Sequence, residues 1–142
     1  MTKHVVQEII LEGKGDSIEL SFSDIALKMF NIVTDTASVN PVLTKTIIIR
    51  SKDIKDLLYQ FLKKLFDTAN QDLFLLSYVK NIMIEKINNE YMLNATLLGD
   101  KLKNHNIKDI VKLVTEKNIS IKQDKEGCIS QVVIIVERLH EI

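Results

Sequence analysis

The stretch from residue 51 to residue 70, SKDIKDLLYQFLKKLFDTAN, carries the clearest periodic signal in the chain. Its large apolar residues recur at steps of three and four, which is the spacing of one face of an amphipathic helix. Asp53 stands where an N-cap is expected, so the pattern predicts a helix that begins there and ends near Ala69. The apolar face of this helix consists of Ile54, Leu57, Leu58, Phe61, Leu62, Leu65 and Phe66.

The residues before this helix alternate between strand and helix patterns. A run centred on three isoleucines predicts a strand over residues 44–50. Asp16 followed by Glu19 has the spacing of a capping box and predicts a helix over residues 17–33. The apolar, β-branched run at residues 5–11 predicts a strand at the start of the chain.

The residues after the second helix have the pattern of strands. Asn88 and Asn89 tolerate positive φ and predict the turn of a hairpin. Two alternations of strand and helix followed by a run of strands predict an α+β fold, a mostly antiparallel sheet with two helices packed against it. We expect one domain over residues 1–142. The remaining predicted strands cover residues 79–87, 91–98, 110–114, 118–123 and 129–136, with a loop at 99–108.

Composition narrows the classes of function. The chain has 142 residues, and 19 Lys and Arg balance 19 Asp and Glu, so the net charge argues against broad electrostatic capture of nucleic acid. A single cysteine, Cys128, excludes an internal disulfide and a multi-cysteine zinc site. No apolar run approaches the length of a membrane span, and no secretory signal is apparent, which predicts a cytoplasmic protein that does not associate with a membrane.

Few residues suggest chemistry by themselves. The sequence lacks a phosphate-binding glycine loop, and its three histidines are scattered, so we expect them at the surface. Glu8 lies between Val6 and Ile10 on one face of the first predicted strand. At the other end, Glu141 precedes Ile142, whose carboxylate adds a second charge. Converging carboxylates would hold a hard cation such as calcium, and solvated surface glutamates are the alternative explanation.

Two helical segments and one later segment resemble the archease family. Residues 15–35, GDSIELSFSDIALKMFNIVTD, are similar to its first helix, where G-D-S/T-L-E-E-A-F is followed by A-L-A-x-F and T-D. Residues 51–74 are similar to its second helix, typically D-L-x-x-L-L-Y-x-F-L-x-E-L-L. The residues in register with the family segment H-E-P-K-x-E-V-K-A-I-T are His105, Lys108, Val111, Lys112 and Thr115.

The resemblance implies an accessory role and a partner. Archeases are small α+β proteins that activate the RtcB-type tRNA-splicing ligase by promoting its guanylylation and repeated turnover. On this resemblance we expect a protein that is not an enzyme and has no catalytic residues, that binds an RtcB-type RNA ligase, and that engages tRNA at most indirectly. The alternatives are a diverged chaperone-like module with another client and a small metal-dependent hydrolase.

The resemblance also implies a divalent cation, calcium, and a set of site residues. Glu8 aligns with the aspartate of the family's H-T-A-D motif, whose other residues are replaced here. Glu141 and Ile142 match the terminal D-I of the family, and a competing register puts Glu137 at the position of that acid. Lys112 matches the family lysine that is important for function. The predicted metal ligands are therefore Glu8, Glu141 and Ile142, with Glu137 as the alternative, and Lys112 is the predicted ligase-activating residue.

Overall fold

The structure, a computed structural model, describes the backbone of residues 2–141 and the side chains of residues 5–138. It contains two α-helices and seven strands that pair antiparallel, which confirms the predicted α+β class. The elements are β1 (Thr2–Gly15), α1 (Ile18–Val33), the 3-10 helix η1 (Thr36–Ser38), β2 (Leu43–Ser51), α2 (Ile54–Asp72), β3 (Phe74–Ile87), β4 (Glu90–Lys101), the 3-10 helix η2 (Leu102–Asn104), β5 (Asp109–Val114), β6 (Ser120–Asp124) and β7 (Gly127–Glu141).

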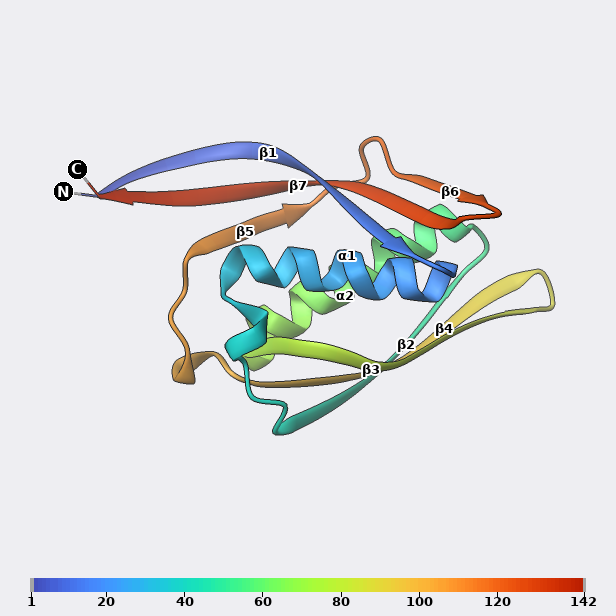
Figure 1. The fold of residues 1–142 in the computed structure, drawn as a ribbon, viewed down its shortest axis with the longest axis horizontal. Helices are drawn as coiled ribbons and strands as arrows, with labels where there is room; N and C mark the ends of the chain where they lie inside the picture. Colours follow the sequence, from blue (N-terminus) through green and yellow to red (C-terminus); the bar gives the residue numbers. More distant parts are fainter. Residues whose placement is uncertain (1, 142) are drawn as a thin grey trace.

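The elements form three layers, with both helices between two sheets (Figure 1). Sheet A has the order β1-β7-β5, and β6 also pairs with β7; sheet B has the order β2-β4-β3. The strands therefore form two sheets, and each covers one side of the helices. Because each sheet uses one face to cover the helices, its other face is turned to solvent. We call this second face the outer face.

The first strand and helix differ in detail from the sequence prediction. β1 extends to Gly15 because its ladder with β7 is uninterrupted. The N-cap of α1 is Ser17, not the expected Asp16: the Ser17 backbone is extended, and its hydroxyl accepts a 3.1 Å hydrogen bond from the amide of Leu20. Ser17 satisfies one of the free amides of the first helical turn, which is what an N-cap does.

The second helix and the hairpin largely match their predictions. Asp53 caps α2 by accepting from the amide of Lys55 at 3.1 Å, as expected. The helix runs past Ala69 to Asp72, and Leu73 ends it in the left-handed conformation with φ 50°. Asn88 and Asn89 form the turn between β3 and β4 with φ of 51° and 63°, the conformation that favours asparagine in tight hairpins.

Helix α1 packs unusually close to β1. A Cβ atom on Gly13 would lie 2.3 Å from the carbonyl oxygen of Ser21 and 2.7 Å from the amide nitrogen of Ile25. The Ser21 hydroxyl uses this closeness to donate a hydrogen bond to the Gly13 carbonyl at 3.2 Å, and it is also bonded to the hydroxyl of Ser130. Glycine at position 13 thus fixes how near the helix layer comes to sheet A.

The core lies between the sheets. The rings of Phe22 on α1 and Phe61 on α2 stack with centroids 6.1 Å apart, and both side chains are fully buried.

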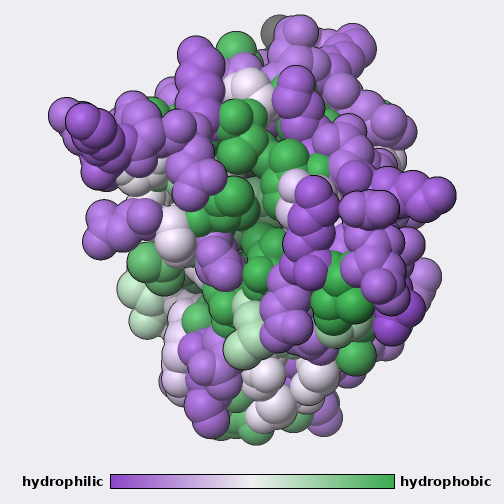
Figure 2. All heavy atoms as spheres, turned by 90° about the vertical axis from the view of Figure 1, so that its right-hand side faces the viewer, coloured by the Kyte–Doolittle hydropathy of each residue, from purple (hydrophilic) through white to green (hydrophobic). Residues whose placement is uncertain are grey.

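At the end of the molecule where β1 leads into α1, hydrophobic side chains gather in the middle of the face, with hydrophilic ones around them (Figure 2). Among the described helices, none is long and apolar enough to cross a membrane.

Candidate functional site

The long ladder between β1 and β7 decides which predicted site residues meet. It pairs Thr2 with Glu141 at one end and Gly15 with Cys128 at the other. Residues that are directly opposite in an antiparallel pair lie on the same face of the sheet. Among the described side chains, the even-numbered residues of β1 from Val6 and the odd-numbered residues of β7 up to Glu137 therefore share the outer face of sheet A. This face carries Glu8 and Glu137 of the predicted site.

Lys112 occupies a β-bulge in the neighbouring strand β5. Val111 pairs with Val136 and Leu113 pairs with Ile135, so Lys112 is the extra residue between them. Val111 is buried on the inner face, whereas the side chain of Lys112 is 51% exposed. A bulge redirects a side chain and interrupts the ladder locally. Here it presents an ammonium group on the outer face of a rigid sheet.

The neighbour of this ammonium is the carboxylate of Glu137 on β7. The distance from Lys112 Nζ to Glu137 Oε2 is 3.4 Å, and the side chain of Glu137 is only 17% exposed. This distance is longer than the 2.7–2.9 Å typical of a charge-assisted hydrogen bond. Because the side chain of Lys112 is half exposed and its contact with Glu137 is long, its ammonium group remains accessible to another anion.

Glu8 lies on the same face, one strand away. It pairs with Ile135, so Glu137 is its diagonal neighbour two residues along β7. Such diagonal pairs have separations of about 7–8 Å. The carboxylate of Glu8 is 3.0 Å from the Nζ atom of Lys117, and both side chains are more than half exposed. The structure therefore brings together two glutamates, Glu8 and Glu137, and matches each with a lysine.

Glu141 lies far from this cluster along the ladder. It pairs with Thr2, six residues beyond Ile135 on β7, which corresponds to about 20 Å at 3.4 Å per residue. The side chain of Glu141 and the whole of Ile142 lie outside the described residues. The backbone register thus does not bring Glu141 next to Glu8, and it places the alternative acid, Glu137, there.

These carboxylates do not fit a calcium site as the described residues stand. Calcium takes six to eight oxygen ligands, and no group of three His, Cys, Asp or Glu side chains among the described residues is placed to hold a metal ion. Lys117 and Lys112 already neutralise Glu8 and Glu137. A cation at this position would have to displace both lysines.

A second polar cluster, around Asp100 and His105, is more buried than the sequence indicated. The side chain of His105, expected at the surface, is 9% exposed, and its Nε2 atom donates to Asp100 Oδ2 at 2.9 Å. Asp100 also accepts from the Lys101 amide at 2.8 Å and from Asn104 Nδ2 at 3.1 Å. These bonds fix η2, the single helical turn between β4 and the segment that leads to β5. The four residues of this cluster lie within six consecutive positions, 100–105, which is too short a stretch to show a periodic pattern.

Asp100 makes the stability of the fold depend on pH. The hydrogen bond from His105, followed by that from the Lys101 amide, lowers the pKa of Asp100 below its ordinary value of 3.8. A carboxyl group with a lowered pKa in the folded state stabilises the fold above its ordinary pKa, and this contribution is lost as pH falls through the lowered value. We expect the free energy of unfolding, measured in urea, to decrease below about pH 4.

The matched variant for this prediction is Asp100→Asn. It removes the titrating group while keeping the size of the side chain, so its unfolding free energy should decrease less steeply between pH 4 and pH 2 than that of the wild type. Identical slopes for the two proteins would show that Asp100 contributes nothing to the acid sensitivity.

The sequence of this chain matches a known protein family. A model of the archease protein family (MTH1598/TM1083) matches residues 7–136, nearly the whole described chain. This protein belongs to the archease family. The archease of Methanothermobacter thermautotrophicus is 32% identical over 122 residues, which cover 85% of this chain and 86% of the relative. That of Methanosarcina barkeri is 29% identical over 129 residues, covering 89% and 88%.

The fold of this archease is also that of a solved structure. The solution structure of Methanobacterium thermoautotrophicum protein 1598 superimposes with a TM-score of 0.74 at 25% identity, and the match covers 94% of this chain and 96% of that one. The family match ends at residue 136, one residue before Glu137. The last part of β7 in this archease, from Glu137 to Glu141, therefore lies beyond the matched residues.

Proposed function

We propose that this archease is a non-catalytic accessory protein that activates an RtcB-type RNA ligase in tRNA splicing by promoting its guanylylation and turnover. Membership of the archease family supports the class of partner. The observation that carries the proposal is the position of Lys112, which extends from a bulge on the outer face beside the mostly buried Glu137. Guanylyl transfer develops negative charge on phosphate oxygens, and a positioned ammonium stabilises such charge.

The surroundings of Lys112 favour a protein as the partner. Val6, Ile10 and Leu113 are large, exposed hydrophobic residues on the same outer face. Exposed apolar side chains with charged neighbours are typical of surfaces that bind other proteins. The paired charges of the Glu8 and Glu137 cluster suit the polar rim of such an interface, and the net charge of zero gives no general attraction for tRNA. We therefore propose direct contact with the ligase and indirect contact with tRNA.

A multiple-turnover ligation assay tests this function. The purified protein alone should join no RNA, and it should raise the number of turnovers completed by an RtcB-type ligase from the same organism. The guanylylated fraction of the ligase should rise in parallel. Unchanged turnover at a stoichiometric excess of the protein would contradict the proposal and favour a diverged chaperone-like module with another client. Nothing among the described residues favours the hydrolase alternative, since they hold no cluster suited to a metal.

A calcium titration tests whether Glu8 acts together with the terminal residues. A ligand that binds only the folded state raises the melting temperature as its concentration increases. Since Glu8 is paired with Lys117 and lies about 20 Å along the ladder from Glu141, we expect Glu8→Gln to have the same calcium dependence of the melting temperature as the wild type. A calcium-induced rise that is lost in Glu8→Gln would overturn this expectation.

A further inference from the structure

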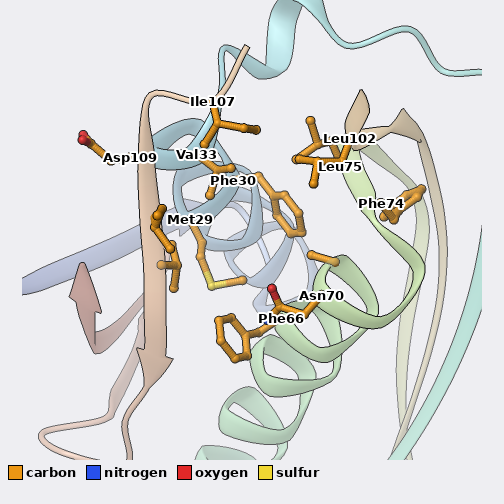
Figure 3. Close-up of a pocket in the computed structure, with 13 residues that line it drawn as sticks. Met29, Phe30, Val33, Phe66, Asn70, Phe74, Leu75, Leu102, Ile107 and Asp109 are labelled. Carbon is orange, nitrogen blue, oxygen red and sulfur yellow. The ribbon is translucent and has the colours of Figure 1, made fainter. Parts of the chain in front are cut away.

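An apolar cavity of about 170 Å³ lies between the C-terminal halves of α1 and α2 and reaches β5 at Val111, the residue before Lys112. Met29 and Phe30 of α1 form one wall, and Phe66 and Ala69 of α2 form another. Leu102 and Ile107, from the segment between β4 and β5, close a third side (Figure 3). The cavity is partly open to solvent, and its walls are mostly apolar.

The size and lining of the cavity suit a single ring. An engineered protein cavity of about 150 Å³ lined by Leu, Ile and Phe stays dry and binds benzene. The cavity here is similar in volume and in the chemistry of its walls. Met29 adds a polarisable thioether, which makes favourable contacts with aromatic rings.

The few polar groups at the cavity favour an uncharged ligand. Asn70 and Asp109 are the polar residues among those that line it. Asn70 is exposed, and the carboxylate of Asp109 points away from the other lining side chains (Figure 3). The carbonyl of Val33, at the end of α1, already accepts from the amide of Lys108 at 2.7 Å. A charge placed among these apolar walls without a partner is unfavourable, so we expect an uncharged ligand to bind more tightly than a phosphate or a carboxylate.

The wall at the mouth of the cavity is already fixed in position. Besides the Lys108 bond, Thr34 Oγ1 donates to the carbonyl of Asn106 at 2.9 Å, and the amide of Leu102 donates to the carbonyl of Leu73 at 2.7 Å. Ile107 remains exposed at this wall and would lose solvent contact against a bound molecule. A pre-formed site with apolar surface still to bury loses little conformational freedom on binding.

We propose that this cavity is a binding site for a small, uncharged, apolar molecule of about the size of one aromatic ring. The proposal does not depend on the ligase, because binding is tested on the isolated protein. A bound molecule would contact the ends of α1 and α2, the segment that precedes β5, and β5 itself through Ile110 and Val111.

Methionine-methyl NMR with benzene as the probe tests the proposal directly. With [¹³C]methyl-methionine labelling, benzene should shift the Met29 methyl signal through its ring current, and the shift should saturate. Met83, which is exposed on the outer face of sheet B, provides the internal control and should not move. An unmoved Met29 signal, or equal and unsaturated shifts of both methyls, would overturn the proposal.

Two further arms test the location and the chemistry. Ala69→Leu fills the cavity and should abolish the Met29 shift, whereas Ala37→Leu, on the exposed η1 turn, should retain it. Benzoate, the same ring with a charge, should bind at least about tenfold more weakly than benzene, because its carboxylate finds no cation in the cavity. Equal affinity for the two probes would overturn the proposed chemistry even if Ala69→Leu failed to fold.

Discussion

Replacing Lys112 with alanine is expected to reduce ligase activation by about 10- to 150-fold. The estimate follows from the loss of one hydrogen bond to a charged phosphate oxygen, which contributes about 1.5–3 kcal/mol. The side chain is half exposed and its pair with Glu137 is loose, so the free energy of unfolding should change by less than about 0.5 kcal/mol. Multiple-turnover ligation and urea unfolding of the same preparation measure the two effects.

The matched control for this variant is Lys122→Ala. Lys122 is an exposed lysine on β6 and pairs with Ile129 on the outer face of the same sheet. Its replacement with alanine therefore removes one positive charge without affecting the bulge. It should activate the ligase normally. Equal losses for both variants would indicate a general electrostatic effect. Normal activation by Lys112→Ala would contradict the role proposed for the bulge.

Gly13→Ala is expected to destabilise the fold strongly. The added Cβ atom would meet backbone atoms of α1 at 2.3 Å and 2.7 Å, and the helix backbone cannot move aside as a flexible side chain can. Overpacking of this kind costs about 1–3 kcal/mol, and we expect the upper part of this range because the helix must move away from sheet A. The midpoint of urea unfolding should fall accordingly.

The neighbouring residue supplies the control for Gly13→Ala. Glu12 is exposed on the outer face, so Glu12→Ala should change the unfolding free energy by no more than about 0.5 kcal/mol. If Gly13→Ala were equally mild, the close approach of α1 to β1 would not be a constraint on the fold.

Local patterns predicted the elements well and the distances between them poorly. The period of α2 and the two asparagines of the β3–β4 turn depend on neighbours in sequence, so the sequence alone revealed them. The pairing of Glu8 with Ile135 depends on the register of two strands at opposite ends of the chain. A continuous run of apolar residues in β7 gives no signal that would choose between one register and another.

The positions of the site residues likewise depend on strand pairing that the sequence alone does not reveal. Lys112 was identified through the family resemblance, but its place in a bulge required the pairing of β5 with β7. The sequence predicts a last strand over residues 129–136, whereas β7 continues to Glu141, which pairs with Thr2 and lies six residues beyond Ile135, the partner of Glu8. His105 was missed because its burial comes from a single turn around Asp100, and no repeating pattern marks such a turn.

The order of strands in the two sheets has a consequence for how the protein is made. Sheet B uses only residues from Leu43 to Lys101, so all three of its strands have been synthesised before β7. Sheet A joins β1 to β7, strands that lie more than 100 residues apart in the chain. Contacts between distant parts of a chain form slowly, and synthesis proceeds at about 5–20 residues per second. During that interval β1 has no strand partner, and the face that carries Lys112 is the last part of the molecule to be completed.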